Sequence, residues 1–265
     1  MTSTSTFNPP AADPSRSAPS PGRRVIDAPT RMFHWLFVLS FIGAYATADG
    51  ERWRALHNTL GYTMAGLLAF RVLYGLFGPR HVRLGALVRK LAGVPAWLRA
   101  LLRSGGRSWS EGAHARQRHN LLMALAIAAL MLTVVPVTLT GYGANGGAAG
   151  WFGADWAEDA HAFFGEALLA VVIGHVLLIV GSSLVRRRNL ALPMLTGRAD
   201  TAGPPLVKHD RGALAALLMV AVMAFVGWEW QQSPNGLVPG DALAKRPTPH
   251  LASSDPARDS DGGFD

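Results

Sequence analysis

The chain has 265 residues, of which 49% are hydrophobic and only 16% charged, and its formal net charge is +8. This composition, with a mean hydropathy of +0.20, excludes an ordinary soluble domain and predicts a polytopic membrane protein. Cysteine is absent, which excludes disulfides, iron–sulfur clusters, thiolate-ligated haem and covalent c-type haem attachment. The basic residues flank apolar stretches and form no nucleic-acid module, so membrane topology explains the charge better than nucleic-acid binding does.

The first 22 residues are dominated by Ser, Thr, Pro and Ala. They have too few large apolar side chains to form a core, and they lack the apolar region of a signal peptide. We expect 1–22 to be a disordered cytoplasmic tail.

Apolar stretches with almost no charge follow this tail, and their lengths suit transmembrane helices. Four are expected at about 33–48, 55–77, 120–142 and 161–184, and a fifth at 212–230. The predicted fold class is therefore all-α, an integral membrane four-helix bundle with a fifth C-terminal transmembrane helix. The bundle domain would occupy 23–198, followed by a cytoplasmic linker at 199–211, and after the fifth helix a flexible periplasmic tail at 231–265.

Between the second and third stretches lies a basic segment at 79–119, in which arginines alternate with apolar residues. This pattern favours one or two amphipathic helices at the membrane surface, and an ordinary basic loop is the alternative. Most of the lysines and arginines lie in this segment, before the first helix or after the fourth, whereas residues 143–160 contain none. The positive-inside rule then predicts a multi-pass protein of a bacterial inner membrane, with a cytoplasmic N-terminus and a periplasmic C-terminus.

Four histidines, His34, His57, His161 and His175, fall within the apolar stretches, where an unpartnered imidazole is costly. His161 and His175 are 14 residues apart, which separates them by roughly 21 Å along one helix and returns them to within about 40° of the same face. One helix can therefore serve two stacked planar cofactors.

The expected depths pair His57 with His161 on the periplasmic side and His34 with His175 on the cytoplasmic side. Two neutral imidazoles suit the iron of a low-spin haem, which passes single electrons. A lone intramembrane histidine is about as often a helix–helix hydrogen-bonding group, so the evidence is the two depth-matched pairs. His119 is the one plausible substitute ligand.

Other residues fit the same hypothesis. Gly61 and Gly165 each follow a histidine by one helical turn, either to let a macrocycle approach or to pack helices. Arg71 follows His57 by 14 residues and is expected to pair with haem propionates, or else to extend to the interface.

Three motifs carry a resemblance to a known family. They are Val25-Ile-Asp-Ala-Pro-Thr-Arg-Met-Phe-His34-Trp35, Phe70-Arg71-Val-Leu-Tyr-Gly-Leu-Phe-Gly-Pro-Arg80 and the closing Asn189 with Thr196-Gly197-Arg198. Together with the His57 and His161–His175 segments they resemble the bacterial cytochrome b561 family, which includes the cytochrome b subunits of nickel–iron hydrogenases, over roughly residues 23–198. The resemblance implies two haem b groups held by His34, His57, His161 and His175.

It also implies electron transfer between the quinone pool and a redox protein, which we expect to be periplasmic, such as a c-type cytochrome. The alternatives are a membrane-anchor cytochrome b subunit of a larger oxidoreductase such as a hydrogenase, and a haem-free transporter. Any catalysis would be limited to quinol oxidation or quinone reduction, with no separate catalytic residues. Candidates for proton exchange with quinone are Glu166, Tyr62, Asp155, Glu158 and Asp159.

Overall fold

The computed structural model describes residues 22–104, 112–147, 154–199, 204–233 and 237. Nearly all of the predicted N-terminal tail at 1–22 and most of the predicted C-terminal tail at 231–265 lie outside the described residues. The disorder expected of these tails stays a prediction.

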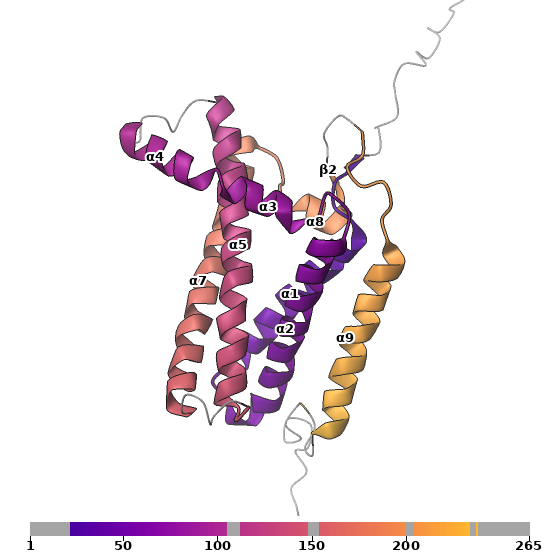
Figure 1. The fold of residues 1–265 in the computed structure, drawn as a ribbon. Helices are drawn as coiled ribbons and strands as arrows, with labels where there is room; N and C mark the ends of the chain where they lie inside the picture. Colours follow the sequence, from indigo (N-terminus) through magenta and orange to yellow (C-terminus); the bar gives the residue numbers. More distant parts are fainter. Residues whose placement is uncertain (1–21, 105–111, 148–153, 200–203, 234–236, 238–265) are drawn as a thin grey trace, which may run out of the picture.

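Long helices dominate the part of the chain that the structure describes (Figure 1). Four of them come first, with α5 running beside α7 and α1 beside α2; α9 then lies against α1 at the opposite edge of the molecule from α7. Their bounds are α1 Ala28–Ala46, α2 Arg54–Phe77, α5 Gly112–Ala144, α7 Ala154–Arg186 and α9 Gly212–Gln232, and a 3₁₀ turn, η1, covers Glu51–Trp53.

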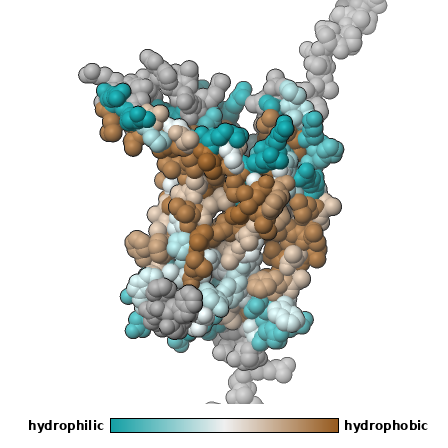
Figure 2. Space-filling view, viewed as in Figure 1, coloured by the Kyte–Doolittle hydropathy of each residue, from teal (hydrophilic) through white to brown (hydrophobic). Residues whose placement is uncertain are grey.

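Among the described residues, four helical segments are long and apolar enough to cross a membrane: Glu51–Phe77, Arg118–Ala144, Asp155–Arg186 and Gly212–Gln232. They make the chain a multi-pass membrane protein. α1 is not among these four, since its first turns carry Arg31 and His34. A total of five spanning helices, with α9 as the fifth, therefore stays a prediction. Figure 2 shows apolar residues gathered around the middle of the visible face, with hydrophilic ones toward both ends.

The helices extend beyond the predicted apolar windows. α5 begins at Gly112 instead of 120, and α7 begins at Ala154 instead of 161. Hydropathy marks the part of a helix that suits lipid, whereas backbone hydrogen bonding continues into polar residues outside it. The basic segment forms two short helices, α3 (Leu84–Leu91) and α4 (Val94–Ser104), so the interpretation as a plain loop is wrong.

One apolar core joins the first four long helices. Its buried residues are Ala44, Met64, Val134 and Leu168, one from each of α1, α2, α5 and α7. Phe37, Phe41, Leu60, Leu68, Leu130, Val137 and Val172 pack around them. The core therefore holds the two helix pairs together near the middle of the bundle.

A buried carboxylate, Asp27, fixes the start of α1. It is fully inaccessible to solvent, and its Oδ1 accepts a hydrogen bond from the Thr30 backbone N–H as a helix N-cap. Its Oδ2 accepts a 2.6 Å bond from the Tyr74 hydroxyl and lies 3.0 Å from His81 Nε2. Asp27 thus ties the start of α1 to the end of α2 and to the residues just after it.

The closing motif returns to the same place. Strand β1 (Arg23–Arg24) pairs antiparallel with β2 (Arg198–Ala199), and the short helix α8 (Leu192–Thr196) lies against α1, where its Met194 carbonyl accepts from the Trp35 indole. Gly197 has φ +74 and would place a Cβ 3.0 Å from the Ile26 carbonyl oxygen, so glycine suits this turn. The first and last motifs of the family pattern are therefore neighbours in space.

The segment that leads to α9 also contacts the start of α1. Leu206 N–H donates to the Arg24 carbonyl, and Asp210 Oδ1 accepts from the Ala28 N–H at 3.0 Å. Asp210 also lies 3.6 Å from the Arg31 guanidinium. The described part of the predicted linker at 199–211 is thus packed against the bundle.

Replacing Asp27 is expected to destabilise the protein. Burial by itself would raise the pKa of Asp27, yet hydrogen bonds from Thr30, Tyr74 and His81 outweigh burial and leave the pKa below its ordinary value of 3.8. Asp27→Ala removes a helix cap and leaves buried donors without an acceptor, which costs on the order of 2–4 kcal/mol. Asp27→Asn keeps a capping oxygen and is expected to lose less.

Thermal unfolding of detergent-solubilised protein, followed by circular dichroism, measures this loss. Because the folded-state pKa is lowered, the stabilisation is complete above the ordinary carboxyl range and is lost as the pH falls through the lowered pKa. The difference between wild type and Asp27→Ala should therefore shrink in strong acid. Equal melting temperatures at neutral pH would contradict this role for Asp27.

Candidate functional site

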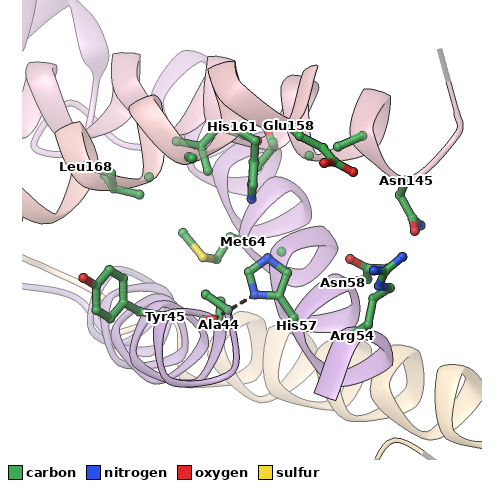
Figure 3. Close-up of a pocket in the computed structure, with 18 of the residues that line it drawn as sticks. Ala44, Tyr45, Arg54, His57, Asn58, Met64, Asn145, Glu158, His161 and Leu168 are labelled. Carbon is green, nitrogen blue, oxygen red and sulfur yellow. Dashed lines mark hydrogen bonds between the residues drawn. The ribbon is translucent and has the colours of Figure 1, made fainter. Parts of the chain in front are cut away.

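Two histidines from different helices face each other across a cavity (Figure 3). His57 lies in the first turn of α2, and His161 lies two turns into α7. Their ring centroids are 5.8 Å apart, and the ring planes are nearly perpendicular, at 89°. The structure therefore brings together two imidazoles that are separated by more than 100 residues in the sequence.

Backbone carbonyls fix the protonation of both rings. Nδ1 of His57 lies 2.8 Å from the Ala44 carbonyl oxygen of α1, and Nδ1 of His161 lies 2.9 Å from the Val137 carbonyl oxygen of α5. A carbonyl oxygen only accepts, so each Nδ1 must carry the proton. Each Nε2 of a neutral ring then has a free lone pair, as a metal ligand requires.

A glycine allows His161 its position. A Cβ built on Gly141 would lie 2.9 Å from His161 Cε1 and 3.0 Å from its Nδ1, closer than side-chain atoms normally approach. Gly141 stands one turn after Val137, the residue whose carbonyl the same ring contacts. This part of α5 therefore seats the His161 ring with both a carbonyl and a missing side chain.

The cavity has a volume of about 690 Å³, which falls within the usual range of about 300–1,000 Å³ for ligand sites. Gly61 and Gly165 both line it, and a Cβ built on either would meet nothing within 4 Å. No neighbouring helix occupies these two positions, which favours space for a cofactor over helix packing.

His34 and His175 form a second arrangement with a different character. The Nδ1 atom of each is buried and has no hydrogen-bond partner within the described parts of the chain, and the two rings are close enough to interact electrostatically. Neither residue lines the cavity around His57 and His161. Buried nitrogens without partners are costly in apolar surroundings, so this pair also fits a bound group that the protein itself does not supply.

The donor set fits haem. Two neutral imidazoles leave the other coordination positions of a metal to further ligands, and the macrocycle of haem b supplies four. The facing lone pairs at His57 and His161 and the open space at Gly61 and Gly165 agree with this chemistry.

Arg71 lies at the opposite end of α2 from His57. One of its guanidinium nitrogens donates a 3.2 Å hydrogen bond to the Val82 carbonyl, in the turn before α3. A Cβ on Gly75 would lie 3.2 Å from the same nitrogen. Arg71 is therefore held among the chain's own groups, and pairing with a haem propionate stays a prediction.

Only some of the candidates for proton exchange line the cavity. Glu158, Glu166 and Tyr62 line it, whereas Asp155 and Asp159 do not. Tyr62 accepts a hydrogen bond from Asn145 at 3.3 Å. Glu166 accepts one from the hydroxyl of Tyr45 at 3.3 Å, and Tyr45 also lines the cavity.

The sequence hypothesis missed Gly141, Tyr45 and the two carbonyls that hold the imidazoles. A glycine inside a predicted span was a usable signal for Gly141, because glycine weakens a helix unless something approaches closely. The sequence held no signal for the carbonyls of Ala44 and Val137, since every residue carries a backbone carbonyl.

Comparison with known proteins adds one finding. Residues 25–197 match the model of a family described as prokaryotic cytochrome b561. No curated protein and no solved structure matches the chain.

Gly141→Val is expected to displace the His161 ring and lower the haem b content of the purified protein. Gly227→Val, in α9, is the matched control, because a Cβ added there meets nothing within 4 Å and the residue does not line the cavity, so the haem should stay in place. A pyridine haemochrome assay on detergent-purified protein measures both variants. Full haem content in Gly141→Val would contradict the close seating of His161.

Proposed function

Because the chain belongs to the prokaryotic cytochrome b561 family, we propose that it is a di-haem electron carrier between membrane quinol and a redox protein. Membership itself makes the chain a membrane b-type cytochrome that binds haem b and transfers electrons. The proposal concerns four further points: the number of haems, their ligands, the quinone and the partner.

The observation that carries the proposal is the facing pair His57 and His161, with both Nδ1 protons donated to carbonyls and a cavity of about 690 Å³ around the rings. We assign this pair to one haem b. We assign His34 and His175 to the second. Arg71 pairs with propionates at the second site.

Haem b, when bound, supplies reversible one-electron exchange at iron. His57 with His161, and His34 with His175, would each hold one haem b, and all four ligands from the chain would be neutral imidazoles. The carbonyls of Ala44 and Val137 keep the first two rings in one orientation, which makes them more basic ligands. The apolar core lies between the four helices that carry these histidines.

The proposed orientation places the His57/His161 site toward the periplasm and the His34/His175 site toward the cytoplasm. Support comes from the basic residues of α3 and α4, such as Arg89, Lys90 and Arg103, because α3 and α4 lie at the other end of the bundle from the end of α5 and the start of α7. The C-terminus after α9 is then periplasmic, where a redox partner docks. The domain limits stay 23–198 for the haem bundle and 212–230 for the fifth span.

The pairing of ligands predicts separable haem losses. His175→Ala is expected to remove about one of two haems per chain and to leave the His57/His161 site, and His57→Ala is expected to do the reverse. The pyridine haemochrome assay counts the haem, and reduced-minus-oxidised spectra of the two variants should differ, since each retains another site. His119→Ala is the control and should keep both haems. Loss of both haems from either ligand variant, with the protein still in the membrane, would contradict this pairing.

The proposed substrate predicts direct reduction by a quinol. Decylubiquinol mixed anaerobically with the oxidised, haem-replete protein should reduce its haem within seconds, as followed by stopped-flow absorbance. Dithionite serves as the quinone-independent control and should reduce all of the haem. The quinone part of the proposal would be overturned if dithionite reduced the protein but decylubiquinol failed to reduce it at every pH at which the protein is folded.

A further inference from the structure

We infer that Tyr45 and Glu166 form a proton-exchange pair at the outer side of the His57/His161 cavity, where the Glu166 carboxylate accepts the proton that a quinol hydroxyl releases. The inference rests on the proposed exchange of electrons with membrane quinol. It assigns to two named side chains the proton chemistry that this exchange requires.

The pair belongs both to the cavity wall and to the outer surface. Tyr45 and Glu166 both line the cavity, and the Tyr45 hydroxyl donates to Glu166 Oε1 at 3.3 Å. Tyr45 is 44% exposed, and Glu166 is exposed as well. A molecule outside the bundle can therefore reach this hydrogen bond without entering the core.

The pair lies at the seam between α1 and α7. α7 packs mainly along α5, and α1 mainly along α2 and α9, so the direct packing between the described parts of α1 and α7 is limited. The Tyr45–Glu166 bond bridges this seam. A lipid-soluble quinol that moves along the outside of the bundle would meet the cavity at this point.

The Glu166 carboxylate lies within an apolar helix, where a charged group is energetically costly. It lies 11 residues beyond Asp155 in a helix able to span the membrane, about 16 Å along the axis. Among the described residues the ion pairs are Arg31–Asp210, Arg54–Glu51 and His81–Asp27, and Glu166 belongs to none of them. An exposed carboxylate inside an apolar span, without a cationic partner in the described chain, marks a site of proton chemistry.

The proton balance is complete. Oxidation of one quinol breaks two O–H bonds and releases two protons and two electrons. The electrons leave one at a time through the bound haem to a one-electron redox protein. Each proton passes to the Glu166 carboxylate, which releases it before the next, so Glu166 takes up a proton twice per quinol. Reduction of quinone runs the same steps in reverse.

Charged groups that line the same cavity provide a route by which protons from Glu166 reach water. Asp49 follows α1, Glu51 and Arg54 stand at the start of α2, and Glu158 lies on α7; all four line the same cavity. Arg54 and Glu51 are 3.9 Å apart and strongly exposed to solvent. Protons released by Glu166 therefore pass toward carboxylates that are in contact with water.

The test separates proton acceptance from helix bridging. Glu166→Gln keeps an oxygen that can accept the Tyr45 hydrogen bond but takes up no proton, and Glu166→Asp keeps a carboxylate. Tyr45→Phe removes only the hydroxyl. Asp159→Asn is the matched control, since it neutralises an acid of α7 that does not line the cavity.

Each purified, haem-replete variant is mixed with decylubiquinol across a range of pH. The rate of haem reduction by Glu166→Gln is expected to fall about 100-fold or more, and to lose its dependence on pH. Glu166→Asp should retain part of the rate, Tyr45→Phe should be slowed less than Glu166→Gln, and Asp159→Asn should match wild type. Haem content and reduction by dithionite should be unchanged in all of them.

A second readout does not depend on rate. The infrared difference spectrum recorded on mixing with decylubiquinol should show a carboxylic acid band in wild type and in Asp159→Asn, and this band should be absent from Glu166→Gln. If wild type is reduced by decylubiquinol but Glu166→Gln matches its rate and keeps the band, the inference is overturned and the proposed function stands. If decylubiquinol does not reduce wild type, the proposed function fails, and the inference fails with it. Loss of haem in both Glu166→Gln and Tyr45→Phe would overturn the inference by showing a purely structural bridge.

Discussion

Everything at the His57/His161 site depends on a hydrogen bond from an imidazole to a backbone carbonyl. The bonds to Ala44 and Val137 fix which nitrogen of each ring carries the proton. They also join helices, since each ring reaches across from its own helix to a neighbour. The same two contacts therefore set the orientation of the rings and join neighbouring helices, and a change that shifts α1 or α5 along its axis would turn a ring away from its present orientation.

The two histidine pairs differ in this respect. His57 and His161 have carbonyl partners at Nδ1, whereas the Nδ1 atoms of His34 and His175 have no hydrogen-bond partner among the described residues. A hydrogen bond at Nδ1 makes the opposite nitrogen a stronger donor to iron and favours the oxidised metal. If each pair holds a haem through Nε2, as proposed, the two haems would differ in reduction potential.

Much of this arrangement could be predicted from the sequence, because apolar length and histidine spacing obey simple geometry. The 14-residue interval from His161 to His175 and the apolar windows led to a helical membrane bundle, and the quoted motifs led to the family. Helix ends could not be located, since α5 and α7 continue through polar residues that hydropathy ignores. Gly141 and the Tyr45–Glu166 contact depend on how distant helices pack, and one-dimensional spacing carries no information on that. The resemblance motifs were recognised as a pattern, but their physical role, meeting around Asp27 and Gly197, required coordinates.

The contact between Asp210 and the start of α1 has a consequence for biogenesis. Ala28 N–H and Arg31 obtain their carboxylate partner only from a residue 182 positions later than Ala28, after all four bundle helices have been made. The amino end of α1 is therefore unfinished when the helix is made, and it is completed only when the segment before α9 emerges from the ribosome. A protein truncated before Asp210 would lack this carboxylate and leave the start of α1 without it.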